Sequence, residues 1–179
     1  MIRYAITDRQ NLSFDHLNED LMRISDKASM IVYRDKENDD YAVYAERFMA
    51  GVRNYSFEKV LLHTEVSLAS RLNADGVHLS SGQFDEIAGA KDMGLFVVVS
   101  CHTVDEAKKA EWLGADMITY SPIYTSPGKG RPLGLGALKE LKGIINIPII
   151  ALGGILNEVQ IVACQEAGAS GFASIRFFQ

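Results

Sequence analysis

The residues most suited to chemistry lie in positions 116–135, DMITYSPIYTSPGKGRPLGL, which begin as an apolar strand and continue as a polar loop. Its prolines and glycines exclude regular structure after the strand. Hydroxyl groups and positive charges collect in the loop, on Ser121, Thr125, Ser126, Lys129 and Arg131. Long loops after parallel strands often hold ligands in α/β proteins. The stretch therefore predicts a site for an anion; the alternative is a solvated loop with incidental charge.

Polar side chains also follow the other predicted strands. They are Asp8, Arg34, Lys36, His63, Thr64, His78, Ser100, His102, Ser174 and Arg176. Cations and hydroxyl groups dominate this set, and carboxylates are few. Magnesium prefers hard oxygen ligands, usually one or two carboxylates. We therefore predict no metal-ligating residues, and no cofactor follows from the residues themselves.

Two glycines, Gly153 and Gly154, follow an apolar strand and precede a predicted helix. Glycine lets backbone N–H groups approach an oxyanion, and a helix N-terminus adds partial positive charge. Together with Ser174 and Ile175 they predict a phosphate-binding site, as found at the corresponding place in many βα barrels. A bare tight turn is the alternative.

Three histidines and a cysteine are candidates for proton transfer or nucleophilic attack. His102 and His63 could each act as acid or base near neutral pH. His102 could instead make an orienting hydrogen bond at a strand end, and His78 is expected to satisfy backbone groups. A nucleophilic role is not favoured for Cys101, which has no partner except His102. Trp112, on a helix, is expected to pack against the barrel.

Strands and helices alternate along the whole chain. The predicted strands span 2–7, 30–33, 59–63, 75–79, 95–100, 116–120, 148–152 and 171–174; the predicted helices span 14–24, 41–52, 66–72, 84–93, 104–113, 135–141 and 158–167. Strict alternation implies parallel strands, and apolar runs such as Val97-Val98-Val99 imply a sheet buried on both faces. Eight units predict a single α/β domain over residues 1–179, a compact (β/α)8 TIM barrel.

The helix ends repeat one pattern, in which Asn73, Gly114 and Gly168 each precede an alanine and the next strand. These residue types end helices in the left-handed conformation at least cost. Only five residues follow the last strand, so the eighth helix is expected to be missing or truncated. We expect Phe177 and Phe178, or a partner subunit in a homodimer, to cover the exposed apolar surface.

Composition excludes several classes of protein. The net charge of −5 argues against nucleic-acid binding. No apolar run approaches the roughly 20 residues needed to cross a bilayer, and no signal peptide is recognisable at the start. Cys101 and Cys164 lie in apolar patterns without a disulfide framework, which predicts the reducing cytoplasm.

Several motifs together resemble the thiamine phosphate synthase and TenI family. They are Asp75-Gly-Val-His-Leu79, Val99-Ser-Cys-His-Thr103, Gly114-Ala-Asp116, Ser121-Pro-Ile-Tyr124 with Lys129, and Ala151-Leu-Gly-Gly-Ile155 with Gly168-Ala169. The resemblance implies a TIM barrel that handles a thiazole phosphate. The synthase joins this compound to hydroxymethylpyrimidine diphosphate and releases pyrophosphate with the help of magnesium, whereas TenI-type members aromatise a thiazole phosphate tautomer by proton transfer.

The resemblance also implies roles for particular residues. Those matching the diphosphate and pyrophosphate site are Arg34, Lys36, Ser100, Ser126 and Lys129; those matching the thiazole phosphate site are Gly153, Gly154, Ser174 and Ile175. Together with the two histidines considered above, His102 and His63, Lys129 is the third candidate for a catalytic role.

Some positions depart from the family pattern. The Asn-Asp pair of the synthase appears as His63-Thr64, its second metal-binding aspartate falls near Gln83, and the tautomerase histidine falls at Pro122. Magnesium is therefore expected only if the synthase reaction survives. The open hypotheses are an enzyme of thiamine biosynthesis, a regulatory or non-catalytic phosphate-ligand binder, a tautomerase, and an unrelated phosphosugar isomerase.

Overall fold

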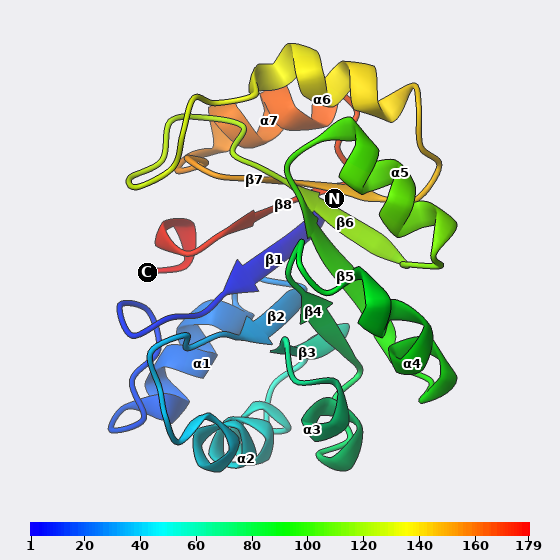
Figure 1. The fold of residues 1–179 in the computed structure, drawn as a ribbon. Coiled ribbons are helices and arrows are strands. Elements are labelled where there is room, and N and C mark those ends of the chain that lie inside the picture. The colour runs from blue at the N-terminus through cyan, green and yellow to red at the C-terminus, as the bar shows by residue number, and fades with distance from the viewer.

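Eight parallel strands close into a ring in sequence order (Figure 1). The computed structural model describes all residues 1–179. The strands are β1 (Ile2–Ile6), β2 (Met30–Tyr33), β3 (Lys59–His63), β4 (Gly76–Leu79), β5 (Phe96–Cys101), β6 (Met117–Tyr120), β7 (Ile149–Leu152) and β8 (Gly171–Ser174). Strand β1 pairs with β2 through Tyr4 and Met30, and with β8 through Tyr4 and Ala173, which closes the barrel.

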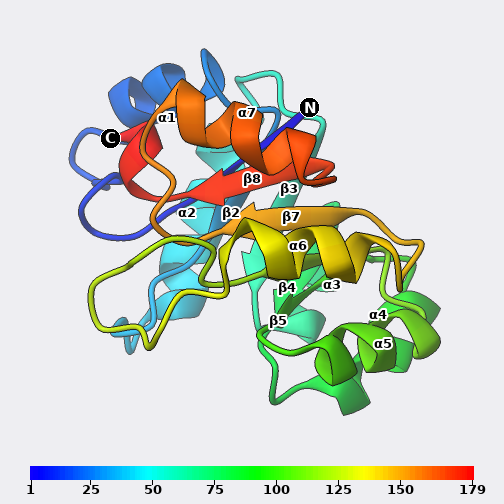
Figure 2. The same cartoon turned by 90° about the horizontal axis from the view of Figure 1, so that it is seen from above.

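Seven α-helices form the outer layer around the barrel. They are α1 (Leu17–Ser25), α2 (Tyr41–Val52), α3 (Val66–Arg71), α4 (Ile87–Asp92), α5 (Val104–Trp112), α6 (Gly134–Lys142) and α7 (Glu158–Glu166). The loop after β6 and the C-terminal turn lie on the side toward which the strand arrows point, as both views show (Figures 1 and 2). The predicted TIM barrel is confirmed. None of its helices has the length and apolar character that spanning a membrane requires.

The apolar side chains form two layers. Because alternate residues of a strand face opposite sides, one set fills the barrel interior and the other faces the helices. The interior set is Tyr4, Ile6, Met30, Val32, Leu61, Val98, Met117, Ile150 and Ala173. The outer layer is a cluster of 41 buried residues between strands and helices. The interior is therefore a packed core, and space for a ligand is left at the strand ends.

Three helix ends follow the pattern that the sequence predicted. Asn73, Gly114 and Gly168 have φ angles of 55°, 94° and 98°. In each case the next residue donates its N–H to a carbonyl five residues back, as Ala74 does to Ala69 at 2.9 Å. This bond satisfies a carbonyl that the helix end would leave free. The repeated sequence pattern is thus a repeated left-handed cap.

A short 3₁₀ turn, Arg176–Phe178, takes the place of an eighth helix. Phe178 is fully buried and stacks on Phe172, with ring centroids 5.8 Å apart and planes 5° apart. Phe177 meets the same ring edge to face at 5.1 Å. The expectation that these two phenylalanines cover the last strand is confirmed.

Three expectations about helices need correction. The first helix begins at Leu17 rather than at position 14, because Phe14 turns away to pack on Tyr44 with ring centroids 4.7 Å apart. The helix expected over 84–93 is a 3₁₀ turn, Phe84–Glu86, followed by α4. Trp112 does not pack against the barrel: it is 83% exposed, because it lies on the side of α5 opposite the buried alanines.

Candidate functional site

A cavity of about 450 Å³ opens at the carboxyl ends of the strands. Its lining comes from the carboxyl ends of all eight strands and the segments that follow most of them, and it contains all eleven residues that we singled out for catalysis or ligand binding. These are Arg34, Lys36, His63, Ser100, His102, Ser126, Lys129, Gly153, Gly154, Ser174 and Ile175. Thr125 and Arg131, which belong to the same loop as Lys129, do not line it.

The end of the cavity formed after β7 and β8 is rich in free backbone N–H groups. Those of Gly154 and Ile175 donate to no other protein atom. Gly154 is held in place by Gln160, whose side-chain amide donates to its carbonyl oxygen at 3.1 Å. Unpaired N–H groups gathered in a fixed loop attract an anion, and a phosphate oxygen is the usual partner. We call Gly153, Gly154 and Ile175 the amide end.

Both glycines are required by the packing of the loop after β6. Gly153 and Gly154 have φ angles of +101° and +70°. A Cβ on Gly153 would lie 2.8 Å from Pro122 Cα, and one on Gly154 would lie 2.6 Å from the carbonyl oxygen of Thr125. The glycines therefore serve two purposes, because they let the neighbouring loop lie directly on them and Gly154 leaves its amide free.

Ser174 contributes less directly than the sequence suggested. Its hydroxyl donates to the carbonyl oxygen of Ile155 at 3.0 Å and accepts from the N–H of Phe177 at 3.2 Å. The hydroxyl proton is thus engaged inside the protein. Ser174 ties the loop after β7 to the C-terminal turn and so positions the amide end.

The lining of the same cavity also carries positive charge. Arg34 and Lys36 follow β2, Lys129 belongs to the loop after β6, and Arg176 lies in the C-terminal turn. None of them is within 4.0 Å of an acidic group. We call Arg34, Lys36 and Lys129 the cation end. Arg176 was not among the ligand-binding residues that we predicted, although its position after β8 was a usable signal.

The cations influence one another across the mouth. Burial lowers the pKa of Lys36 from its ordinary value, and the nearby charges of Arg34 and Lys129 lower it further. The loops after β2 and β6 therefore bring their charges within electrostatic range. Burial also lowers the pKa of Arg34, and Asp8 and Asp35 partly offset this shift. A multiply charged anion would relieve this crowding.

His102 is held in one tautomer. Its Nδ1 lies 2.9 Å from the carbonyl oxygen of Ser121. A carbonyl can only accept, so Nδ1 carries the proton and Nε2 is left as the acceptor. The ring lines the cavity. His102 thus makes the orienting hydrogen bond considered from the sequence and also keeps a nitrogen able to accept a proton.

His63 and His78 are kept neutral. Burial lowers the pKa of each to about 3, and the charges of Arg34 and Lys36 add to the shift. Protonation would place a further positive charge beside these cations in a desolvated site. His63 can therefore serve as a neutral hydrogen-bonding group near pH 7, and proton transfer is better suited to His102.

A buried hydrogen-bonded network lies beneath the cavity floor. His78 Nδ1 is 2.9 Å from the hydroxyl of Tyr4, and His78 Nε2 is 2.9 Å from the hydroxyl of Ser100. His78 therefore bonds side chains and not the backbone groups that we expected. Sequence reasoning missed Tyr4 because it lies in an apolar strand. The period of two along β1, which turns Tyr4 and Ile6 inward, was the available signal.

Cys101 is not a nucleophile in this arrangement. Burial raises its thiol pKa to about 12, and its Sγ lies 3.8 Å from the carbonyl oxygen of Val99. The thiolate, which is the reactive form, is therefore strongly disfavoured at neutral pH.

The residues present do not fit a magnesium site. Asp8 is the only carboxylate in the cavity lining, and its Oδ1 already accepts from the N–H of Gln10 at 2.7 Å. Gln83, at the place of a metal-binding aspartate, is bonded to Ser80, Thr64 and Glu86. No three acidic, histidine or cysteine side chains converge. Hard oxygen ligands are too few for a divalent cation beside several cations.

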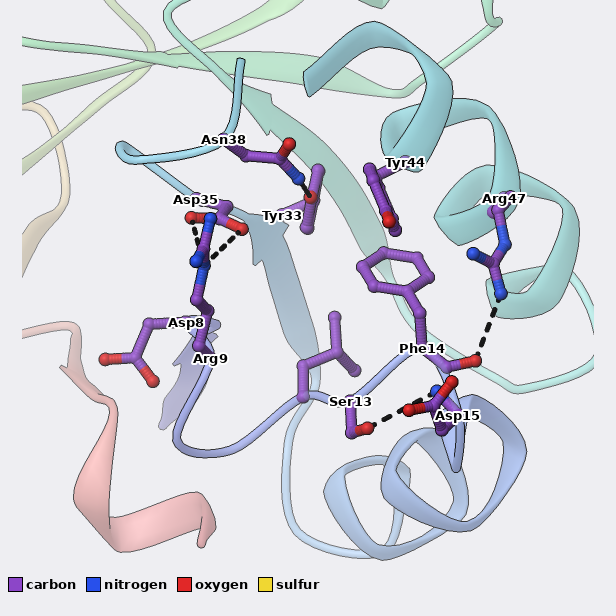
Figure 3. A pocket seen from close by; sticks show the side chains of 11 residues that line it. Asp8, Arg9, Ser13, Phe14, Asp15, Tyr33, Asp35, Asn38, Tyr44 and Arg47 are labelled. Carbon is purple, nitrogen blue, oxygen red and sulfur yellow. Dashed lines mark hydrogen bonds and ion pairs between the residues drawn. The ribbon is translucent and has the colours of Figure 1, made fainter. Parts of the chain in front are cut away.

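A second cavity, of about 350 Å³, lies outside the barrel between the segment after β1 and helix α2 (Figure 3). Its arginines are already paired. Arg9 Nε donates to both carboxylate oxygens of Asp35 at 3.1–3.2 Å, and Arg47 donates to the carbonyl oxygen of Phe14 at 3.1 Å. The arginine charges there serve the fold, unlike those of the larger cavity.

Comparison with known proteins identifies the family of this chain. The family model described as "Thiamine monophosphate synthase" matches residues 3–178. "Putative thiamine-phosphate synthase 2" of Aquifex aeolicus is 38% identical, over 98% of this chain and 96% of its own. "Thiamine-phosphate synthase" of Methanocella arvoryzae is 33% identical, over 96% of this chain and 84% of its own.

A solved structure gives the same result. Thiamine phosphate pyrophosphorylase from Pyrococcus furiosus superimposes with a TM-score of 0.81 and 26% identity, over 97% of this chain and 85% of that one. The likeness covers nearly the whole chain. This chain therefore belongs to the thiamine monophosphate synthase family.

Proposed function

We propose that this protein is a synthase-type transferase of thiamine biosynthesis. The amide end would bind the phosphate of a thiazole phosphate, and the cation end would bind the diphosphate of hydroxymethylpyrimidine diphosphate. Joining the two breaks the bond between the pyrimidine methylene group and the diphosphate, so pyrophosphate leaves. The names of the relatives support this reaction.

The observation that carries the proposal is that two kinds of anion-binding group, backbone amides and unpaired cations, line one cavity. A protein that bound only one phosphate would need the amide end alone. The three unpaired cations of the cation end add a site for a second, more highly charged group. Arginine and lysine stabilise a leaving pyrophosphate because they offset the charge that develops on its oxygens.

The direct experiment is to incubate the protein with both precursors and measure thiamine phosphate and pyrophosphate. Lys129→Ala should remove most of the turnover while thiazole phosphate still binds. Lys139→Ala, on the exposed side of α6, is the matched control and should leave turnover unchanged. Absence of product from the wild-type protein, with and without magnesium, would refute the transferase.

The cation end also leads us to propose that magnesium is not needed for diphosphate binding. The single carboxylate of the lining, Asp8, supports this. Titration with pyrophosphate in the presence of a chelator should give the same affinity as without it. A large loss of affinity in the chelator would show that a metal ion takes part.

A second candidate function is a binder that no longer turns over. It is favoured by Thr64 and Gln83, which replace the carboxylates that the family pattern predicts. Such a protein would be stabilised against heat by thiazole phosphate but would release no pyrophosphate. Ligand at one hundred times its dissociation constant should add about 2.7 kcal/mol of stability.

We propose a homodimer as the oligomeric state. Support comes from an exposed apolar stripe on and before α7, formed by Leu156, Val159 and Val162. A short 3₁₀ turn, and no eighth helix, follows α7 and β8 in the chain. Sedimentation of Val159→Asp should give a monomer; a wild-type monomer at micromolar concentration would contradict the proposal.

We also propose a reducing compartment, the cytoplasm, as the location. Both cysteines, Cys101 and Cys164, are free and buried. Fractionation of cells that produce the protein would test this directly.

A further inference from the structure

We infer that Tyr4, acting through His78, makes Ser100 a hydrogen-bond donor toward the cavity, so that the site selects a ligand that presents an unprotonated acceptor there. Tyr4 would thus be a positioning residue at the floor of the barrel. The ligand class, an anionic phosphate or diphosphate oxygen, rests on the proposed function; the hydrogen-bond direction does not.

Tyr4 fixes which group donates and which accepts in each hydrogen bond of the network. Its side chain is fully buried, and its hydroxyl has one partner, His78 Nδ1 at 2.9 Å. Burial raises the pKa of Tyr4 well above its ordinary value, so the hydroxyl keeps its proton. A buried O–H group without an acceptor is strongly disfavoured. Tyr4 must therefore donate, and His78 Nδ1 must accept.

The tautomer of His78 follows from this. A neutral imidazole has one donor and one acceptor nitrogen. Since Nδ1 accepts, Nε2 carries the proton and donates to Ser100 Oγ at 2.9 Å. Burial keeps the ring neutral by lowering the pKa of His78, and the positive charges of Arg34 and Lys36 also oppose a second proton.

Thr119 is a second neighbour of the Ser100 hydroxyl. It is fully buried, and its hydroxyl has a single side-chain partner, Ser100 Oγ at 3.5 Å. At 3.5 Å this contact is longer than the usual O–H···O hydrogen bond, so its contribution is small. Ser100 accepts from His78 at 2.9 Å, and its own proton is left for the cavity that it lines.

This arrangement sets specificity rather than affinity alone. A ligand that offered a donor to Ser100 would meet another donor, and both protons would be left unpaired in a desolvated place. A phosphate or diphosphate oxygen has only lone pairs to offer and fits. The network thus filters ligands at the floor by hydrogen-bond direction, in addition to the charge filter at the mouth.

The tautomer can be read without any ligand. Long-range ¹H–¹⁵N correlation spectra of histidine-labelled protein distinguish an Nε2–H from an Nδ1–H ring, and His78→Gln identifies the signal among the four histidines. The wild-type protein should show His78 as the Nε2–H tautomer. An Nδ1–H ring would overturn the inference, whatever the protein binds.

Binding of inorganic pyrophosphate, followed by calorimetry, tests the consequence. Ser100→Ala should weaken it by about 10- to 100-fold, the range for one hydrogen bond to a charged group. Tyr4→Phe conserves volume and should weaken pyrophosphate binding by about 5-fold. The hydroxyl of Ser100 is still present in this variant, but His78 is no longer fixed as its donor. Tyr33→Phe, a buried tyrosine outside the barrel interior, is the matched control and should bind normally.

The double variant separates positioning from general damage. In the Ser100→Ala background, Tyr4→Phe should have no further effect, because the hydroxyl that it orients is gone. Equal losses in both backgrounds would refute the positioning role. If wild-type protein failed to bind pyrophosphate, the proposed function would fall, and the spectrum of His78 would still decide the network.

Discussion

The two ends of the cavity attract anions by different physical means. The amide end uses neutral N–H groups on a backbone that is locked by packing, with Gly153 and Gly154 lying against the loop after β6. The cation end uses charged side chains that lack ionic partners, and two of them, Arg34 and Lys129, lie close enough to lower the pKa of Lys36. One end is preorganised and uncharged, whereas the other carries several positive charges.

This difference teaches what each end can recognise. Fixed dipoles favour a phosphate of defined geometry, and their interaction depends weakly on salt. Flexible cations favour total negative charge, and their interaction falls as salt screens it. A monophosphate and a diphosphate would thus be sorted within one cavity. Four experiments would break or sharpen this contrast.

The largest effect is expected at the amide end. Gly154→Ala combines a left-handed backbone with a Cβ that would lie 2.6 Å from the carbonyl oxygen of Thr125. Strain and overpacking together should lower the free energy of unfolding by about 4 kcal/mol, and phosphate binding should be lost. Urea denaturation and phosphate titration measure the two quantities.

Gly128→Ala is the matched control. Its φ of +69° is nearly the same as that of Gly154, but nothing lies within 4 Å of the added Cβ. Only the backbone strain remains, so the loss should be about 1 kcal/mol. Equal losses for the two variants would show that loop packing does not hold the amide end.

The next effect concerns the histidines beside the cations. His63 and His78 have pKa values of about 3 in the folded protein, below the ordinary 6.5. The unfolded chain therefore binds protons first, and stability falls as pH drops from about 6.5 toward 3. By pH 5 the pair should cost about 4 kcal/mol, about 2 kcal/mol for each ring.

Urea denaturation at pH 7 and pH 5 measures this loss. His63→Gln should reduce the difference between the two pH values, whereas His16→Gln, an exposed histidine, should not. A slope unchanged by His63→Gln would mean that burial and the neighbouring cations do not lower the pKa of this ring.

A smaller effect is expected for ligand binding at the cation end. Lys129→Ala should weaken pyrophosphate binding by about 2 kcal/mol, the worth of one charge-assisted hydrogen bond. The loss should shrink as sodium chloride is raised, while phosphate binding at the amide end changes little. Equal salt dependence for both anions would erase the distinction between the ends.

The smallest effect is a gain. Thr64 has a φ of 64°, which is costly for a β-branched residue. Asparagine tolerates this conformation, so Thr64→Asn should raise the free energy of unfolding by about 1 kcal/mol. Thermal denaturation measures the gain, and a loss would mean that the bond from Thr64 Oγ1 to the carbonyl oxygen of His63 outweighs the strain.

Most of the fold could be predicted because its signals are local. Alternating apolar runs and the left-handed caps at Asn73, Gly114 and Gly168 are written in short stretches of sequence. The fate of Trp112 could not be predicted in this way, since its exposure depends on which side of α5 faces the strands. The predicted start of the first helix at Phe14 was wrong, because the packing of Phe14 on Tyr44 overrides the local apolar spacing.

In the site, too, features with a local sequence signal could be predicted, and features that depend on distant residues could not. Residues after each strand were predictable, because parallel strands end on one side of a barrel. The bond from Tyr4 to His78 joins positions 74 apart in sequence, and no local pattern shows it. The engagement of Ser174 by Ile155 and Phe177 is equally invisible, because a serine at a strand end looks the same whether its proton is free or used.

The loop after β6 has a consequence for the speed of ligand capture. Its first part is clamped, since Ile123 and Tyr124 donate to the carbonyl oxygens of Leu152 and Gly153 at 2.9 Å. Only the exposed stretch near Lys129 remains to be immobilised when an anion arrives. Little conformational entropy is then lost on association, so encounter with the ligand, rather than ordering of a long segment, should set the rate at which the complex forms.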